Sequence, residues 1–159
     1  RLNFYGQKDI EEIVSRSAKL LKITVEPKAV REIASASRFT PRVANRLLKR
    51  VRDFVQINDS EVITENYARE ALRMLEIDDK GLEDTDRKIL LTIAKNFDGG
   101  PVGLKSIAAA ISEEEATIED VYEPYLMQIG LLARTPKGRV ITSAGFEHFG
   151  IKKRAGTLI

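Results

Sequence analysis

Apolar residues recur every three or four positions through the first half of the chain, which is the spacing of one face of an α-helix. The stripes are Ile10, Ile13, Val14, Ala18 and Leu21; then Val30, Ile33 and Ala34; then Val43, Leu47, Val51, Phe54 and Val55; and finally Tyr67, Ala68, Ala71, Leu72 and Leu75. The residues predicted to start these helices are Asp9, in a capping box with Glu12, then Pro27, Thr40 followed by Pro41, and Thr64. The short loops between the stripes predict a compact four-helix domain that ends near Glu76.

The second half of the chain also begins with helical spacing. We expect helices at Asp84–Phe97 and Leu104–Ile111, with Val102 as part of a very short strand between them. A third helix, capped by Thr117, is expected to run to Gly130, because glycine readily ends a helix with a positive φ.

The pattern then changes to that of two strands. Leu131–Thr135 and Arg139–Thr142 are joined by Pro136-Lys137-Gly138, which predicts a tight hairpin. A short segment, Ala144–Phe149, closes the domain. The order helix, short strand, helix, helix, hairpin is typical of a winged-helix domain, and the alternative is an α+β domain of no particular type.

Composition limits the classes of protein that need to be considered. The 159 residues suit one medium domain or two small ones of roughly 75 to 80 residues each. The charge-rich segment Ile77–Glu83 indicates a junction between two domains. The absence of cysteine excludes a thiolate metal site and fits a reducing cytoplasm, and no apolar run approaches the roughly 18 residues of a membrane span. Because the chain starts at Arg1 rather than Met, we expect it to be a piece of a longer protein.

Three cations lie on the predicted hairpin. Arg134 precedes the turn, Lys137 lies in it and Arg139 follows it, so the two arginines flank the tip. Such a ribbon can contact nucleic-acid phosphates, which supply affinity without reading sequence. The alternative is a charged turn that only keeps the surface soluble.

The third helix of this domain is acidic, which is unusual for a helix in the recognition position. Its first turns carry Glu119, Asp120 and Glu123, and carboxylates are repelled by a phosphate backbone. Pro124 should also disturb the helix interior. We therefore expect the hairpin, not this helix, to meet DNA. The acidic residues are a protein contact or, as the simpler interpretation, a solvated face.

A second basic stretch lies in the four-helix half, from Arg38 to Arg52. Arg42 falls in the first turn of its helix, where free backbone N–H groups favour anions, and it shares a face with Arg46. Arg42 could therefore grip a phosphate. Composition alone favours the alternative of a solvated basic face.

One segment nearly matches a nucleotide-binding phosphate loop. In Gly99–Ser106 a leucine, Leu104, stands where the second glycine of G-x-x-x-x-G-K-[ST] must lie, and the loop follows a helix rather than a buried strand. We expect no nucleotide there. His148 is the only histidine and has no visible partners, so neither a metal site nor a catalytic residue is predicted.

Six segments, in the same order along the chain, carry a resemblance to the RuvB family of bacterial Holliday-junction branch-migration motors. They are Thr40–Phe54, Asp86–Lys88, Gly99–Leu104, Thr117–Val121, Glu123–Leu126 and Arg134–Arg139. The resemblance implies a mainly α chain: the end of a large ATPase domain at 1–5, a small AAA+ lid domain at 6–76, a linker at 77–78 and a winged-helix head at 79–159.

The resemblance also implies roles for single residues. Arg42 matches the arginine that reaches the nucleotide phosphates from the lid, and Tyr5 matches a tyrosine that borders the nucleotide. Arg134 and Arg139 match head arginines that contact DNA, with Lys137 between them. The sequence departs from the family at Phe39, where the family usually has glycine before Thr-Pro-Arg.

The motor that such a chain belongs to is expected to be a cytoplasmic homohexamer on duplex DNA at Holliday junctions, working with RuvA and RuvC and using ATP with Mg²⁺. The chain alone should neither hydrolyse ATP nor hold it tightly, since the phosphate loop, the Mg²⁺-binding acids and the arginine finger are outside it. Two other hypotheses stay open: a winged-helix transcription regulator with a helical oligomerisation domain, and a protein-docking module.

Overall fold

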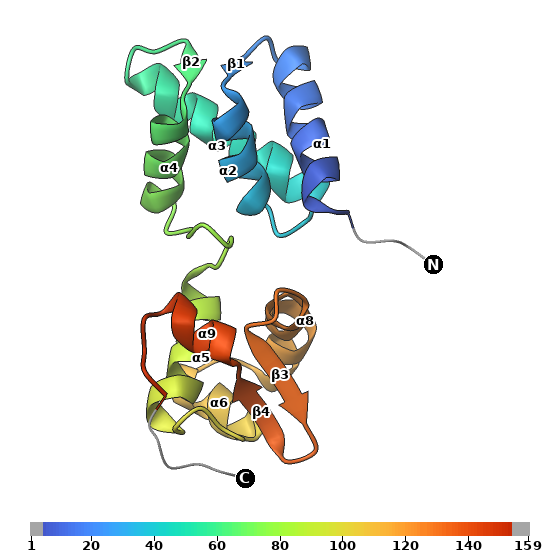
Figure 1. Ribbon diagram of the computed structural model, residues 1–159, viewed down its shortest axis with the longest axis vertical. Helices are drawn as coiled ribbons and strands as arrows, with labels where there is room; N and C mark the ends of the chain where they lie inside the picture. The colour runs from blue at the N-terminus through green and yellow to red at the C-terminus, as the bar shows by residue number, and fades with distance from the viewer. Residues whose placement is uncertain (1–4, 154–159) are drawn as a thin grey trace. The chain divides into compact units, whose positions relative to one another are not determined.

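The computed structural model describes residues 5–153, and its contacts divide the chain into two compact units, Arg1–Glu83 and Asp84–Ile159. Helices dominate both units, which confirms the expected mainly α class (Figure 1). Each unit is described by itself below, and the two are called the lid and the head after the domains that the resemblance implies.

The lid contains four helices in its described part, as the apolar stripes predict: α1 (Gln7–Leu20), α2 (Pro27–Ser35), α3 (Pro41–Ile57) and α4 (Glu65–Met74). Two very short strands, β1 (Thr24–Val25) and β2 (Val62–Ile63), pair in parallel with Thr24 opposite Val62. This pair was not predicted. It ties the loop after α1 to the loop after α3.

The predicted helix starts are right in three cases and wrong in one. Pro27 and Pro41 lie at the first helical position, and the Thr64 hydroxyl accepts a hydrogen bond from the Tyr67 N–H at 3.2 Å. The first helix begins at Gln7, not at Asp9. Asp9 lies inside the first turn, and its carboxylate accepts the Gly6 N–H at 2.8 Å, so the acid caps the helix from within.

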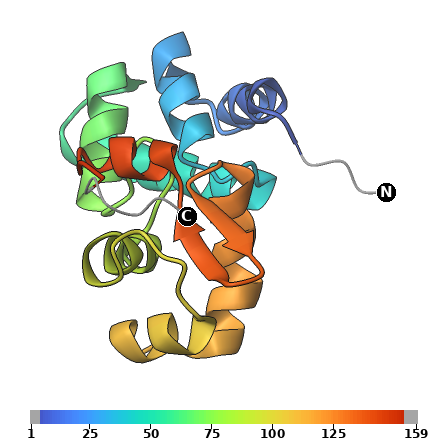
Figure 2. The same ribbon diagram turned by 60° about the horizontal axis from the view of Figure 1, so that its bottom comes forward.

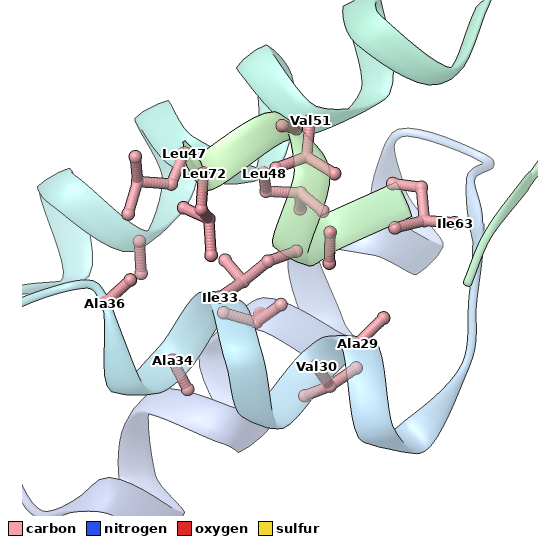
Figure 3. Close-up of a cluster of buried hydrophobic side chains, with 14 of the residues drawn as sticks. Ala29, Val30, Ile33, Ala34, Ala36, Leu47, Leu48, Val51, Ile63 and Leu72 are labelled. Carbon is pink, nitrogen blue, oxygen red and sulfur yellow. The ribbon is translucent and has the colours of Figure 1, made fainter. Parts of the chain in front are cut away.

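Inward-facing aliphatic side chains from all four helices make the core of the lid. Figure 3 shows Ile33 of α2, Leu47, Leu48 and Val51 of α3, and Leu72 of α4 pointing toward one another. Ile33, Leu48 and Val51 have no exposed surface at all, and Ile63 brings β2 into the same cluster. The lid therefore depends on α3 as its central helix, and the outer face of that helix stays in solvent.

The turn before α3 has an unusual backbone. Arg38 and Phe39 both have positive φ, 56° and 52°, a region that glycine adopts more readily than other residues. The Thr40 hydroxyl does not cap α3 as expected but donates to the Arg38 carbonyl at 3.0 Å. A phenylalanine thus holds the left-handed conformation here, and the Thr40–Pro41 helix start is kept.

The head contains α5 (Asp84–Asn96), α6 (Leu104–Ile111), α7 (Glu115–Thr117), a π-helical turn η1 (Ile118–Tyr122), α8 (Glu123–Gln128) and α9 (Ser143–His148). The expected cap at Thr117 is wrong, because the third helical segment already begins at Glu115 and Thr117 lies within it. Gly130 follows this segment with φ 74°, as predicted.

The strands of the head form the predicted hairpin. β3 (Leu132–Thr135) and β4 (Gly138–Ile141) pair antiparallel, with Thr135 opposite Gly138 across a turn of Pro136 and Lys137. Val102 forms the short third strand as an antiparallel bridge to Arg139. The hairpin, orange to red in Figures 1 and 2, lies beside α8, which confirms the winged helix.

The buried and exposed leucines of the lid allow a matched test of this core. Leu48→Ala should cost about 2–5 kcal/mol of unfolding free energy, because it opens a cavity at a site with no exposed surface. Leu20→Ala is the control, since Leu20 is 75% exposed and should lose less than about 0.5 kcal/mol. Urea denaturation followed by circular dichroism measures both, and amide hydrogen exchange shows whether the lid is the unit that opens. Equal losses in the two variants would contradict the assignment of the core.

Candidate nucleic-acid interface

The hairpin register brings the two predicted arginines together. Arg134 and Arg139 are direct cross-strand partners, so their side chains leave the same face of the hairpin. Like charges that face each other across two strands destabilise the pair unless an anion lies between them. The structure supplies such an anion.

Glu123, the first residue of α8, is the carboxylate that holds both arginines. Its Oε1 accepts a hydrogen bond from Arg139 Nε at 2.7 Å, and its Oε2 accepts from Arg139 Nη2 at 3.3 Å and from Arg134 Nη2. The side chain of Glu123 is only 1% exposed, compared with 14% for Arg139 and 43% for Arg134. A carboxylate this deeply buried requires paired cations, and the two arginines provide them.

Glu119 completes the cluster from one turn earlier in the third helical segment. Its Oε1 lies 3.1 Å from Arg134 Nη2 and 3.6 Å from Arg139 Nη2. In contrast to Glu123, its side chain is 45% exposed. Glu119, Glu123, Arg134 and Arg139 are called the wing cluster below.

The backbone between the two glutamates explains how they reach the hairpin. Pro124 lacks an N–H and cannot continue a regular α-helical ladder, and the segment before it is a π-turn in which the Glu123 N–H bonds the Ile118 carbonyl. The prediction that Pro124 disturbs the helix is therefore confirmed. The wider turn changes the direction in which the following side chains point, and Glu123 is the first of them.

The protonation of Glu123 reflects two opposing effects. Burial favours the neutral acid, but the hydrogen bonds and charges of Arg139 and Arg134 outweigh it, so the pKa of Glu123 lies below its usual value. The same pairing raises the pKa of Arg134. Glu123 and Arg134 are therefore charged at neutral pH.

The acidic third helix was interpreted most simply as a solvated face, and for Glu123 this was wrong. Glu123 is buried and ion-paired, so its negative charge is structural. Sequence reasoning assigned no role to Glu119 or Glu123 as partners of the hairpin. The available signal was their spacing of four residues, which on a regular α-helix places two like charges on one face, where cations of a neighbouring element would offset their repulsion.

The remaining predicted residues are not members of this cluster. Lys137 is exposed in the hairpin turn. On the lid, Arg42 is exposed at the second position of α3, and Tyr5 is 49% exposed just before α1. Within residues 5–153, no ion pair involves Lys137 or Arg42.

The glycines of the segment that resembles a phosphate loop have a packing role. Gly99 and Gly100 have φ of 92° and 89°, and a Cβ on Gly99 would lie 2.9 Å from the Phe146 ring. A Cβ on Gly100 would overlap the Arg139 carbonyl oxygen. The turn therefore approaches the backbone of β4 closely, next to the arginine that Glu123 holds, and only glycine permits this approach.

Among the described residues, no helix combines the length and the apolar character that crossing a membrane would require.

The fold and the wing define the class of protein as an AAA lid domain followed by a winged-helix domain. Residues 5–78 match the family described as the RuvB AAA lid domain, and residues 79–150 match the RuvB C-terminal winged helix domain. The chain therefore belongs to the RuvB family.

Solved structures agree with this assignment. The Thermotoga maritima RuvB Holliday junction branch migration motor is 44% identical, with a TM-score of 0.89 over 95% of this chain and 51% of that chain. Two single-substitution variants of the Thermotoga maritima protein are also 44% identical, each with a TM-score of 0.90, and they cover 96% and 95% of this chain. The chain spans about half the length of these structures.

The ion pairs of Glu123 with Arg134 and Arg139 predict that the stability of the head depends on this buried carboxylate. Glu123→Gln should cost about 3–5 kcal/mol of unfolding free energy at pH 7, since it leaves two adjacent guanidinium groups without their shared carboxylate. Because the pKa of Glu123 is lowered by folding, its contribution is full above the usual carboxyl pKa of about 4.3 and is lost as the pH falls through the lowered value.

Urea denaturation at pH 7 and at acidic pH tests both statements. The difference between wild type and Glu123→Gln should shrink as the pH falls. Glu147→Gln, which changes an exposed glutamate of the head in the same way, should differ little from wild type at either pH. A Glu123→Gln protein as stable as wild type at pH 7 would contradict the structural role of the pair.

Proposed function

We propose that the chain supplies the lid and the DNA-binding head of a motor that drives ATP-dependent branch migration of Holliday junctions. One observation carries the proposal: a chain of the RuvB family presents two arginines side by side on the exposed wing of a winged helix. Guanidinium groups at this position suit phosphate oxygens, which they can bind bidentately.

The wing is proposed to contact the sugar-phosphate backbone of duplex DNA through Arg134, Lys137 and Arg139. Arg134 and Lys137 are the exposed members of this set, and Arg139 is the more buried one. Contacts of this type fix the position of the head on DNA without selecting a sequence. This suits a motor that moves along any sequence.

The lid is proposed to serve the nucleotide site of the complete motor. Arg42 would reach the nucleotide phosphates from the start of α3, and Tyr5 would border the nucleotide. ATP or ADP with Mg²⁺ would be held mainly by an ATPase domain outside these 159 residues, so the chain alone would neither hydrolyse ATP nor bind it tightly. The complete motor would act as a homohexamer with the partners RuvA and RuvC.

DNA binding through the wing can be tested by removing its two exposed cations, Arg134 and Lys137. Arg139 still binds the buried carboxylate of Glu123 when both are removed. The double variant Arg134→Ala/Lys137→Ala, called the wing variant below, should bind duplex DNA more weakly. The slope of log K against log[salt] should become shallower by about one to two units. Fluorescence anisotropy with two unrelated duplex sequences, across a salt series, measures both effects.

The matched control is Arg73→Ala/Lys95→Ala, which removes the same two residue types from exposed helix positions that make no ion pair with a described residue. Equal binding by the wing variant and the control would overturn the wing assignment. A strong preference for one of the two duplexes would instead favour a transcription regulator.

The role of Arg42 can be tested in a chain that also carries the ATPase domain. Arg42→Ala should lower the rate of ATP hydrolysis about tenfold or more, because a cation placed on the transferring phosphate is lost. Arg46→Ala removes the same charge one turn later on the same face of α3 and should leave the rate near wild type. Equal effects of the two variants would argue against a specific nucleotide contact.

A further inference from the structure

The wing cluster carries no net charge, although it is the proposed site of DNA contact. Two arginines face two glutamates, with every N···O distance at 3.6 Å or less. At this range the opposite charges cancel most of each other's field at an approaching phosphate. A phosphate can therefore bind Arg134 strongly only if one carboxylate gives way.

The two glutamates differ greatly in how firmly they are held. Glu123 is 1% exposed and accepts three hydrogen bonds from the arginines. Glu119 is 45% exposed and accepts one, from Arg134 Nη2. Exposed ion pairs contribute little free energy, whereas removing one partner of a buried pair is strongly unfavourable. Glu119 is therefore the carboxylate that can leave.

Arg134 is arranged to take a second anion without losing the first. Both glutamates bind its Nη2, while its Nε and Nη1 make no hydrogen bond to any residue between 5 and 153. A phosphate that displaces Glu119 can bind the exposed side of this guanidinium, while the hydrogen bond from Nη2 to Glu123 remains. Arg139 stays fixed meanwhile, since Glu123 binds both its Nε and its Nη2.

We propose that Glu119 occupies, in free protein, the side of Arg134 that a DNA phosphate takes on binding, while Glu123 is a positioning residue that holds both arginines during this exchange. The inference rests on the proposed DNA contact of the wing and adds the residue that sets its strength. Glu119 lowers the affinity of the head for DNA, because a phosphate binds Arg134 strongly only after this carboxylate has moved away. The ligand is a phosphodiester of duplex DNA, and the exchange involves no covalent step.

The test replaces one exposed carboxylate at a time by its neutral amide. Glu119→Gln should raise duplex affinity at low salt about 2- to 10-fold, because the competing carboxylate of an exposed pair is removed. The gain should shrink at higher salt, where the competition is screened. Glu115→Gln is the matched control on the same helical segment: it removes the same charge from an exposed glutamate that pairs with no described cation.

A double-mutant cycle separates a local exchange from a general change in charge. If Glu119 competes with DNA phosphates for Arg134, Glu119→Gln should raise duplex affinity more than Glu115→Gln does. This difference should vanish when both substitutions are made in an Arg134→Ala background. Glu123→Gln, measured where circular dichroism shows it folded, should lower affinity although it too removes a negative charge. The same chemical change four residues apart is thus expected to have opposite signs.

The outcomes distinguish this inference from the proposed function. If Arg134→Ala/Lys137→Ala weakens DNA binding but Glu119→Gln gains no more than Glu115→Gln, the wing contact stands and the exchange is overturned. A loss of affinity in Glu119→Gln overturns it as well, because Glu119 would then position Arg134. If the wing variant binds as wild type does, the proposed function fails and the exchange fails with it.

Discussion

The buried carboxylate of Glu123 is the constraint on which the arrangement of the head depends. Arg134 and Arg139 are cross-strand partners, and a hairpin with two cations facing each other is unstable unless a neighbouring element supplies an anion. Glu123 supplies it from the start of α8, with 1% of its side chain exposed. The wing is therefore fixed to the third helical segment by charge as well as by apolar packing, and the acidity of that segment follows from the basicity of the wing.

Two backbone features place the partners within reach of each other. Pro124 interrupts the regular helical ladder, and the π-turn before it ends with Glu123 directed at the hairpin. On the other side of β4, the turn at Gly100 approaches the Arg139 carbonyl so closely that a Cβ would not fit. Arg139 is thus held through its backbone and its side chain at once, which accounts for its low exposure compared with Arg134.

The elements that were predictable are those whose signal is local. Helical stripes, the hairpin turn and the glycine after α8 are all encoded within a few neighbouring residues, and the structure contains each of them. The cap at Asp9 failed because acids stabilise a helix start from two positions: at the N-cap an acid accepts N–H groups of the first turn, whereas Asp9 lies inside that turn and accepts the N–H of the N-cap residue Gly6. The β1–β2 pair joins segments nearly forty residues apart through two residues each, too few for an alternating pattern to show.

The wing shows a more general limit of reading charge along a sequence. The sequence correctly placed the two arginines on either side of the hairpin tip, and the register adds that they are cross-strand partners. The acidic residues were interpreted from their own helix alone, as a face exposed to solvent. A carboxylate on a helix can repel DNA, or it can hold the cations that bind DNA, and the element packed against the helix decides which. The π-turn also changes which residues share a helix face, so the regular α-helical spacing does not show that Glu123 faces the hairpin.

Under the proposed function, charge compensation also suits a head that moves along DNA. Bare paired arginines would bind phosphates strongly and release them slowly, and affinity differences of this kind appear mainly in the dissociation rate. A motor that advances along DNA must break its contacts in every cycle. In the proposed exchange, the exposed carboxylate of Glu119 offers Arg134 a replacement partner as the phosphate leaves, so that the guanidinium is not left unpaired beside Arg139. A buried carboxylate alone could not do this, because it is bound to both arginines throughout. In the proposed exchange, the difference in exposure between Glu119 and Glu123 assigns release of the DNA to one residue and maintenance of the site to the other, one helical turn away.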